Sequence, residues 1–192
     1  MARVISDPLS ARLGQPVVVD NRPGANGIVG AELVSKSSPD GHTVLITSAS
    51  FAINPGIYRK LPFDPVRGFT PVMNVANGGG LFLAVHPALP VKSVADLVAY
   101  GKRPGARLAY GSAGQGNATH LTAALFNLRA GLDMVHVPYR SAGLSVAALM
   151  GNETQVQFVS LSSSLQYIKA GRIRILAREY AEAVRAAGIE PQ

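Results

Sequence analysis

The sequence predicts an α/β protein with a largely parallel sheet, and three observations lead to this fold class. Strand-like and helix-like segments alternate along the chain with short connections, as in successive strand–helix–strand units. Many of the 20 Gly and 13 Pro residues fall between these segments and mark their ends. The composition is 47% hydrophobic and 15% charged, which excludes a disordered chain. A length of 192 residues allows one ordinary domain or two small lobes.

The first 80 residues are expected to hold two short helices and three strands. Asp7 is a suitable N-cap, Pro8 fits the first helical position and Gly14 ends this helix. Three consecutive valines favour a buried strand at 16–19, because β-branched side chains pack well on a pleated surface. The other elements expected here are a helix at 28–35 and strands at 43–47 and 70–75.

The glycine-rich segment Asn77–Gly80 is the expected boundary between two lobes, and regular alternation follows it. Ser93 and Asp96 form a capping-box pattern that begins a helix ending near Lys102. Glycines end the later helices, as is common at helix C-termini. The other elements expected are strands at 81–85, 108–111, 134–137, 156–159 and 173–176, and helices at 118–130, 143–150, just before 171, and 179–187.

Charge and cysteine content exclude several classes of protein. The formal net charge is +7, but the cations are scattered and do not alternate with aromatic residues or form a recognition helix. They therefore indicate a solvated basic surface rather than a nucleic-acid site. The chain has no cysteine, which excludes disulfides, cysteine-ligated metals and a thiol nucleophile. No apolar run is long enough to cross a membrane, and residues 1–8 do not resemble a signal peptide.

The segment 110–120 carries most of the functional information. It leaves a strand, passes three glycines (Gly111, Gly114 and Gly116) and enters a helix. Backbone N–H groups at such a junction attract anions such as carboxylates. Neutral donors join them at Ser112, Asn117 and Thr119, and His120 lies one turn into the helix. The residues alone leave two alternatives open, a ligand-binding loop or a plain strand-to-helix turn. For His120 the alternatives are a ligand contact and, as the commoner case, a helical histidine with its own partner.

Catalytic, nucleotide-binding and metal-binding patterns are missing from the sequence. It contains no Gly-Lys-Ser/Thr phosphate loop, no Gly-x-Ser-x-Gly elbow and no Ser-x-x-Lys pair. The histidines at 42, 86, 120 and 136 do not have the spacing of metal ligands. The carboxylates lie at turns, caps and exposed helices, without a pair suited to acid–base chemistry. The sequence therefore predicts a binding protein for a small anion, with no catalytic residue, metal or cofactor.

An ordered series of motifs gives the chain a strong resemblance to a known family. The motifs are Gly14–Gly27, Ser38–Thr43, Leu61–Pro65, Phe69–Pro71, Tyr110–Gly114, Asp133–Tyr139 and Ile168–Gly171. Together they resemble the Bug-type (TctC-like) solute-binding proteins of tripartite tricarboxylate transporters, over about residues 2–177. The resemblance implies a type II periplasmic-binding-protein-like fold, in which two α/β lobes joined by crossing strands close on a small carboxylate. Strands 81–85 and 174–176 lie near the expected crossings.

The resemblance also implies the site, the partners and the location. The ligand-binding positions it implies are Ser48, Ser50 and Asn54 in the first lobe, and Ser112, Gly114, Gly116, Asn117, Ala118, Thr119, His120 and Tyr139 in the second. The expected ligand is a dicarboxylate, tricarboxylate, amino acid or aromatic acid, delivered to the membrane subunits of the transporter. The family is periplasmic, whereas the sequence as given, without an export signal, would place the protein in the cytoplasm.

The sequence departs from the family pattern at two places. The signal peptide, first strand and Pro-Gly-Gly-rich loop of the family have no counterpart, and after Arg178 the segment 179–192 resembles the last family helix directly. We therefore expect an incomplete first lobe (1–80, completed by 178–192), a foldable second lobe (81–177), weakened carboxylate affinity and a possible homodimer through unpaired sheet edges. The alternatives are a folded remnant without ligand and, less favoured, an effector-sensing domain; an enzyme is the weakest.

Overall fold

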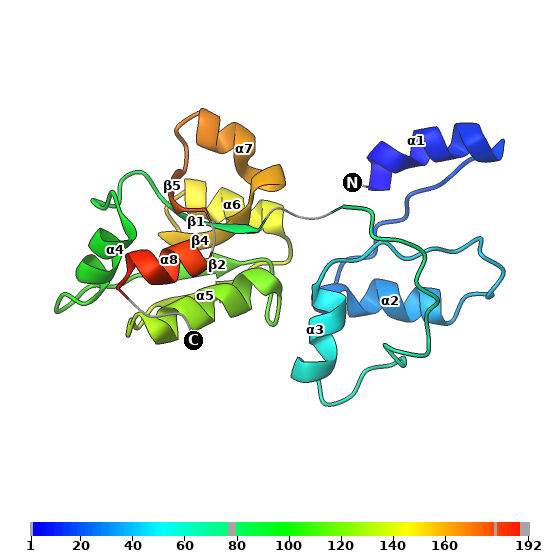
Figure 1. Cartoon of the computed structure of the whole chain (residues 1–192), viewed down its shortest axis with the longest axis horizontal. Helices are drawn as coiled ribbons and strands as arrows, with labels where there is room; N and C mark the ends of the chain where they lie inside the picture. The colour runs from blue at the N-terminus through cyan, green and yellow to red at the C-terminus, as the bar shows by residue number, and fades with distance from the viewer. Residues whose placement is uncertain (1, 77–79, 179, 189–192) are drawn as a thin grey trace. The chain divides into compact units, whose positions relative to one another are not determined.

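The computed structural model describes residues 2–76, 80–178 and 180–188, and the chain divides into two units, 1–70 and 71–192 (Figure 1). The expected boundary at 77–80 falls mostly outside the described residues. The division by contacts lies a few residues earlier, at the end of the segment that contains Phe69. Each unit has its own buried residues and is described separately below.

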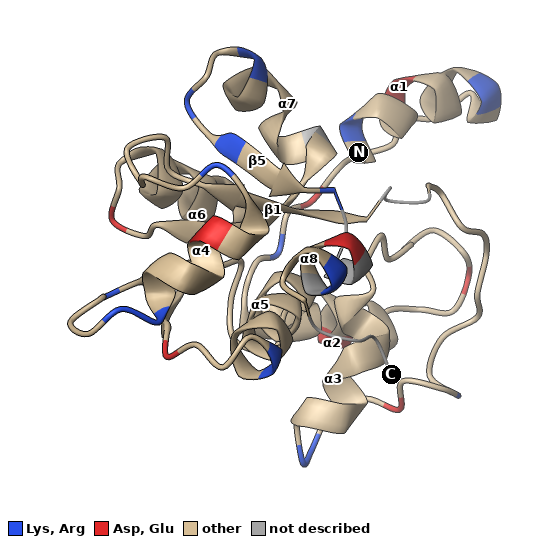
Figure 2. Cartoon of the chain, turned by 60° about the vertical axis from the view of Figure 1, so that its left-hand side comes forward, with Lys and Arg blue, Asp and Glu red and all other residues tan. Residues whose placement is uncertain are grey.

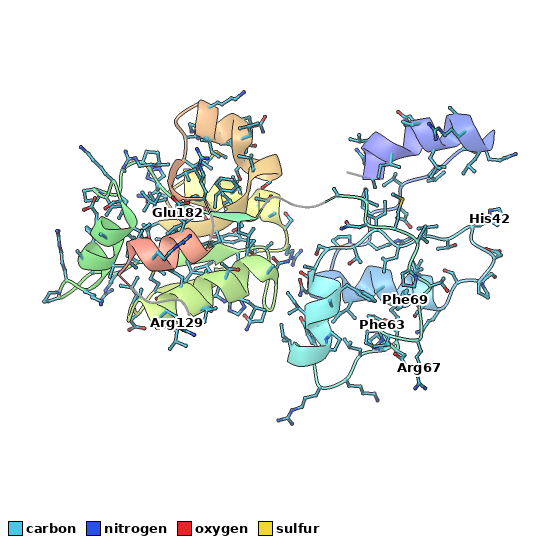
Figure 3. All side chains as sticks on the ribbon, in the orientation of Figure 1. His42, Phe63, Arg67, Phe69, Arg129 and Glu182 are labelled. Atoms are coloured by element: carbon cyan, nitrogen blue, oxygen red, sulfur yellow. The ribbon has the colours of Figure 1, made fainter. Side chains whose placement is uncertain are left out.

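Helices and irregular segments make up the described part of unit 1. Its elements are α1 (Ala2–Leu13), the 3-10 turn η1 (Ala25–Gly27), α2 (Ile28–Ser35) and α3 (Ser50–Ile57). Three phenylalanines form an aromatic cluster: the ring centroid of Phe69 lies 5.1 Å from that of Phe51 and 5.4 Å from that of Phe63 (Figure 3). Such edge-to-face pairs stabilise packing beyond simple burial, so this cluster holds the segment after α3 in place.

Two expectations about unit 1 helices are corrected by the structure. The first helix begins at Ala2, not at Pro8, which lies inside it and removes one N–H from the helical ladder. Helix α3 was not expected, because Pro55 and Gly56 disfavour helix in its last turn. The helix predicted at 28–35 is confirmed with the same bounds.

The strands predicted at 16–19, 43–47 and 70–75 are wrong: the structure describes no strand before residue 80. Apolar side chains in these segments face solvent instead, with Val18 85% exposed, Val44 62% exposed and Val72 78% exposed. Propensity and apolar patterning favour a strand, but a strand forms only beside a hydrogen-bonding partner. The described residues of the chain supply no such partner to these three segments.

Hydrogen exchange tests this absence of pairing. We expect the backbone amides of 43–47 and 71–75 to exchange within about tenfold of the unprotected rate, because no ladder hydrogen bond slows them. Amides of the central strand at 156–160 should be protected by more than about a thousandfold, since they open only with the whole unit. Exchange followed by NMR or mass spectrometry measures both. Comparable protection in the two sets would contradict the structure and indicate paired strands in solution.

Unit 2 contains a five-stranded sheet, and every element predicted after residue 80 is present. The strands are β1 (Leu81–Val85), β2 (Ala109–Ser112), β3 (Val135–Pro138), β4 (Val156–Ser160) and β5 (Arg174–Ala177), in the order β3-β2-β4-β1-β5. The helices are α4 (Val94–Gly101), α5 (Ala118–Arg129), α6 (Ala142–Met150), α7 (Leu161–Lys169) and α8 (Tyr180–Ala186). At the start of α4, Ser93 and Asp96 form the predicted capping box.

The sheet is mixed, which corrects the expectation of a largely parallel one. Strand β2 is parallel to β3 and β4, but β1 is antiparallel to both β4 and β5. The helical crossover through α7 keeps β4 and β5 in the same direction, and β1 inserts between them in the opposite one. Short apolar segments of similar length do not reveal strand direction, so the sequence could not show this insertion.

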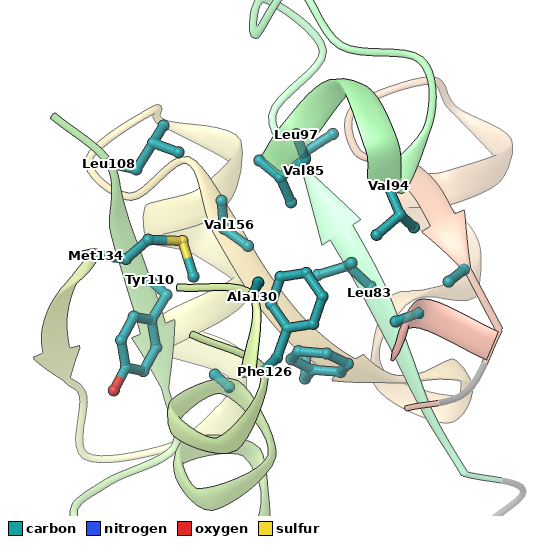
Figure 4. Packing of buried hydrophobic residues seen from close by; sticks show 14 of the residues in the cluster. Leu83, Val85, Val94, Leu97, Leu108, Tyr110, Phe126, Ala130, Met134 and Val156 are labelled. Atoms are coloured by element: carbon teal, nitrogen blue, oxygen red, sulfur yellow. The ribbon is translucent and has the colours of Figure 1, made fainter. Parts of the chain in front are cut away.

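Two apolar layers cover the faces of the sheet. Helices α4, α5 and α8 lie over one face, where Leu83, Phe126 and Phe158 are fully buried (Figure 4). Helices α6 and α7 contact the other face, where Leu149 and Val159 form a smaller cluster. The side chains of β4 alternate between the layers, as the pleat of a strand requires.

Helix α8 lies in unit 2, whereas segment 178–192 was expected to complete the first lobe. It contacts α4, α5, β1 and β5, and Ala183 on it is fully buried in the main apolar cluster. A small side chain allows α8 to approach the strands closely, which explains how this helix packs against the sheet. Residues 179 and 189–192 lie outside the described part of the chain.

Candidate functional site

The loop that follows β2 is a tight turn that only glycine accommodates at two positions. Ser112, the last residue of β2, is fully buried. Gly114 and Gly116 have φ values of 126° and 75°, a region that residues with a side chain rarely adopt. A Cβ at Gly114 would also lie 3.5 Å from the carbonyl oxygen of Tyr139, so the loop passes close to the end of β3.

The loop is fastened to the first turn of α5 by side-chain hydrogen bonds. Asn117 caps the helix: its Oδ1 accepts from the N–H of Thr119 at 3.0 Å and from the Thr119 hydroxyl at 3.0 Å. The same hydroxyl oxygen accepts the N–H of Ala113 at 3.0 Å. The N–H of Gly116 donates to Nδ1 of His120 at 3.1 Å. These bonds fix the loop shape without a ligand.

Three backbone donors of this junction are unpaired. Within the part of the chain that the structure describes, the N–H groups of Gln115, Ala118 and His120 have no hydrogen-bond partner. Ala118 is the first residue of α5, where the helix dipole places partial positive charge. An N–H group at this position can donate to an anion. The arrangement therefore suits a small carboxylate.

Three aromatic rings stack beneath the loop. The His120 and His136 ring centroids are 4.0 Å apart, and that of Tyr110 is 4.9 Å from His136. Oγ of Ser112 lies 2.7 Å from Nε2 of His136 and accepts the N–H of Gly114 at 3.2 Å. The stack therefore supports the loop from strands β2 and β3.

Burial keeps the two histidines of the stack neutral. It lowers the pKa of His136 to about 4, and the charge of neighbouring His120 contributes to a lesser degree. Burial also lowers the pKa of His120. Because Nδ1 of His120 accepts the N–H of Gly116, a proton on that nitrogen would break a bond that shapes the loop. His136 was not predicted as a site residue. It reaches the loop because it pairs with Tyr110 across β2 and β3, and the sequence alone does not show this register.

The free energy of unfolding is expected to decrease as the pH is lowered, because His136 binds a proton more weakly in the folded chain than in the unfolded one. The unfolded chain binds a proton on His136 below about pH 6.5, whereas the folded chain binds it only near pH 4. The stabilisation is therefore complete above about pH 6.5 and is lost as the pH falls toward 4. We expect the free energy of unfolding to drop by about 1 kcal/mol across this window, after allowance for partial solvent screening. Urea titrations at several pH values measure it.

The matched variant for that measurement is His136→Gln, which keeps a polar group near Ser112 but does not titrate. Its unfolding free energy should change less across the same pH window than that of the wild type. Equal slopes for the two proteins would show that His136 does not cause the acid dependence.

The other predicted site residues take up local structural contacts. The N–H of Tyr139 donates to the carbonyl of Ser112 at 3.0 Å, beside the loop. Its hydroxyl, however, donates to Oε2 of Glu153 at 3.3 Å. Burial, with the Glu153 charge and hydrogen bond, raises the pKa of Tyr139. The Tyr139 backbone thus belongs to the loop, while its hydroxyl is engaged elsewhere.

In unit 1, Ser48 lies just before α3, Ser50 is its first residue and Asn54 lies in its middle. Asn54 is buried and exchanges hydrogen bonds with Asn26 of η1: the Asn26 amide donates to Oδ1 of Asn54 at 2.8 Å, and the Asn54 amide donates to the Asn26 carbonyl at 3.3 Å. The N–H of Ser50 donates to Oγ of exposed Ser48 at 3.4 Å. Asn54 therefore stabilises the positive-φ turn at Asn26 in this structure.

Further polar residues lie at the same edge of the sheet and were missed from the sequence. The parallel strands β2, β3 and β4 all end there, where open α/β sheets commonly bind ligands. Ser141 caps α6 after β3, accepting the N–H of Leu144 at 3.3 Å. After β4, the hydroxyls of Ser160 and Ser163 lie 2.8 Å apart. The sequence signal for the last of these residues is the group of serines that directly follows the apolar strand β4.

Other classes of site find little support in the described residues. No group of three or more His, Asp or Glu side chains among them could hold a metal ion. None of the described helices is both long and apolar enough to span a bilayer. Lys and Arg residues are distributed over many elements (Figure 2). Two ion pairs join described residues, Arg22 with Asp20 and Lys36 with Glu32, and all four side chains are exposed.

Comparison with known proteins shows the family to which the chain is similar. The family described as "Tripartite tricarboxylate transporter family receptor" (TctC) matches residues 1–187. A protein of Pseudomonas sp. (strain P51), the UPF0065 protein in the tcbD-tcbE intergenic region, is 36% identical over 176 residues. The match covers 92% of this chain and 52% of that protein, so the chain spans about half the length of the curated relatives it matches.

Solved structures share the fold. One is described as the structure of a periplasmic transporter, with a TM-score of 0.85 and 38% identity over 92% of this chain and 59% of the other. The second is R. palustris Rpa4515 with adipate, with a TM-score of 0.85 and 36% identity over 92% and 59% of the two chains. These likenesses confirm the predicted periplasmic-binding-protein-like α/β fold, in which part of the other chains has no counterpart here.

Proposed function

Because the chain belongs to the tripartite tricarboxylate transporter receptor (TctC) family, we propose that it binds a small carboxylate and releases it chemically unchanged. The observation that supports this most is the junction of β2 and α5, where the shape of the loop is fixed by its own side chains. Three N–H groups there, at Gln115, Ala118 and His120, have no partner among the described residues and can donate to an anion. A preorganised loop of this kind loses little conformational entropy when the ligand binds.

The neutral surroundings of the junction favour one bound carboxylate. Ser112, Asn117 and Thr119 contribute neutral hydroxyl and amide groups to the framework of the loop, and His120 and His136 stay uncharged near neutral pH. Attraction for the anion therefore comes from the N–H groups at the start of α5 and from the dipole of the helix. Moderate affinity of this kind suits a receptor that must release its ligand.

Adipate in the related R. palustris structure makes aliphatic dicarboxylates the first ligands to test. By the same family relationship, we propose that the partners are the membrane subunits of a tripartite tricarboxylate transporter and that the protein acts in the periplasm. Catalysis forms no part of the proposal, which rests on the hydrogen-bond donors of the loop and on the family relationship.

A thermal-melting screen of the purified chain against small carboxylates tests the proposal. The panel should include adipate, malate, citrate, glutamate and benzoate, with chloride at equal ionic strength as the control. A ligand that binds only the folded chain raises Tm, by an amount that saturates according to its concentration relative to Kd. We expect one acid class to give a saturable rise.

The other outcomes contradict the proposal in distinct ways. One cooperative transition that no acid shifts would indicate a folded protein without this ligand class, which the unpaired segments of unit 1 would explain. The lack of any cooperative transition would show that the chain does not fold by itself.

A further inference from the structure

A buried polar cluster lies on the α6 side of the sheet, within the smaller apolar layer. It consists of Ser145 on α6, Thr154 in the connection after α6, and Gln157 on β4, whose exposed fractions are 0%, 0% and 1%. The Ser145 Oγ, Thr154 Oγ1 and Gln157 Oε1 atoms have no hydrogen-bond partner within the part of the protein that the structure describes. Buried polar atoms are almost always paired, so three together require a physical reason.

The three oxygens surround the same side of Gly111. Gly111 lies directly opposite Gln157 in the pairing of β2 with β4. A Cβ on Gly111 would lie 2.8 Å from Ser145 Oγ, 3.1 Å from Thr154 Oγ1 and 3.4 Å from Gln157 Oε1. The φ of Gly111 is not positive, so glycine serves here to leave space and not to make a turn. A side chain at 111 would crowd the cluster.

We infer that Ser145, Thr154 and Gln157 bind one buried water molecule beside Gly111. The chemistry of the three groups is complementary to water: the two hydroxyls donate to its two lone pairs, and the amide oxygen accepts one of its protons. A buried water commonly makes two to four such bonds to otherwise unpaired groups. The cluster contains no carboxylate and its oxygens are neutral, which favours water over a metal cation.

The position of this water suggests what it stabilises. Gly111 directly precedes Ser112, whose hydroxyl contacts His136 and the loop on the way to α5. The water would join α6, the connection before β4 and the end of β2, elements that already contact one another. It is a structural site, independent of whether the loop binds a carboxylate.

A high-resolution crystal structure of the full 192-residue chain is the direct test. We expect a density peak about 2.7–3.2 Å from all three oxygens, the range of hydrogen bonds to water. Direct hydrogen bonds among the three side chains with no peak between them would overturn the inference. A peak at about 2.4 Å, typical of an oxygen-coordinated cation, would overturn it as well.

A double-mutant cycle of Ser145→Ala and Gln157→Leu provides a second test in solution. The two side chains share no direct hydrogen bond, so a shared water is what couples them. We expect the coupling to change the unfolding equilibrium constant by about fivefold or more. The control cycle pairs Ser145→Ala with Phe126→Leu on the opposite face of the sheet, where effects should be additive. Additive effects in the first cycle would contradict the inference, and the crystal structure decides if a variant does not fold.

Discussion

Replacing Phe126 by alanine is expected to lower the free energy of unfolding of unit 2 by about 3–5 kcal/mol. The Phe126 ring projects from α5 and is fully buried. It packs edge-to-face against Phe158 of β4, with ring centroids 5.9 Å apart. Its removal costs the transfer free energy of the ring and leaves a cavity in the larger apolar layer, which close-packed neighbours fill only in part. Chemical denaturation of the wild-type and variant chains measures the difference.

The control for this variant is Leu128→Ala on the same helix. The Leu128 side chain is 75% exposed, so its truncation should change the free energy of unfolding by less than about 0.5 kcal/mol. A loss below about 1 kcal/mol for Phe126→Ala would contradict the packing described for this layer.

Replacing Thr119 by valine is expected to weaken carboxylate binding by about tenfold or more. The substitution keeps the shape of the side chain but removes the hydroxyl that accepts the N–H of Ala113 and donates to Asn117. An unpaired N–H in this nearly buried position costs about 1–3 kcal/mol, and the loop can recover the bond only by changing shape. Calorimetric titration of the acid identified by the melting screen measures the loss of affinity.

The same substitution about one helical turn further along α5 provides the control. Thr122→Val alters a threonine of α5 that is outside the loop, and it should leave Kd within about twofold of the wild type. Equal affinity for the Thr119→Val variant and the wild type would show that the loop does not hold the ligand, even if the protein binds an acid elsewhere.

The sequence predicted unit 2 well because local signals there agree with the tertiary structure. Each apolar segment after residue 80 is bounded by a cap or a glycine, as at Ser93 and Gly131, and each forms the expected element. The direction of β1 was not predictable, because it follows from insertion between β4 and β5 and not from any property of its five residues. The tertiary structure, and not the local sequence, decides which strands pair.

The same reasoning failed in unit 1 for a physical cause. The valines at 17–19 and the apolar residues at 43–47 have strand propensity, yet propensity supplies a small part of strand stability and pairing supplies most. Helix α3 was missed because Pro55 masks the helical pattern of the residues before it. Unit 1 therefore differs from expectation where the pairing partners of its segments are missing from the described chain.

At the candidate site, the sequence identified the loop but not what supports it. The glycines, Asn117 and Thr119 are contiguous along the chain, so their spacing was visible. His136 and Ser160 reach the same edge from other strands, and strand register alone brings them there. The roles of Ser48, Ser50, Asn54 and Tyr139 in ligand binding stay predictions that the melting and titration experiments address.

The place of β1 between β4 and β5 has a consequence for how the chain folds. Leu81 pairs with Ser160, and Leu83 pairs with Ala177, so both edges of β1 join segments made much later during synthesis. The strand must therefore stay without partners while the ribosome completes α4 to α6, and its second edge stays open until β5 is made. Contacts this distant along the chain slow folding, because a long loop must close before any pairing is gained. Until β4 emerges, the nascent chain carries an apolar strand with two open edges, and until β5 emerges it carries one open edge, so association with other chains is a risk during synthesis.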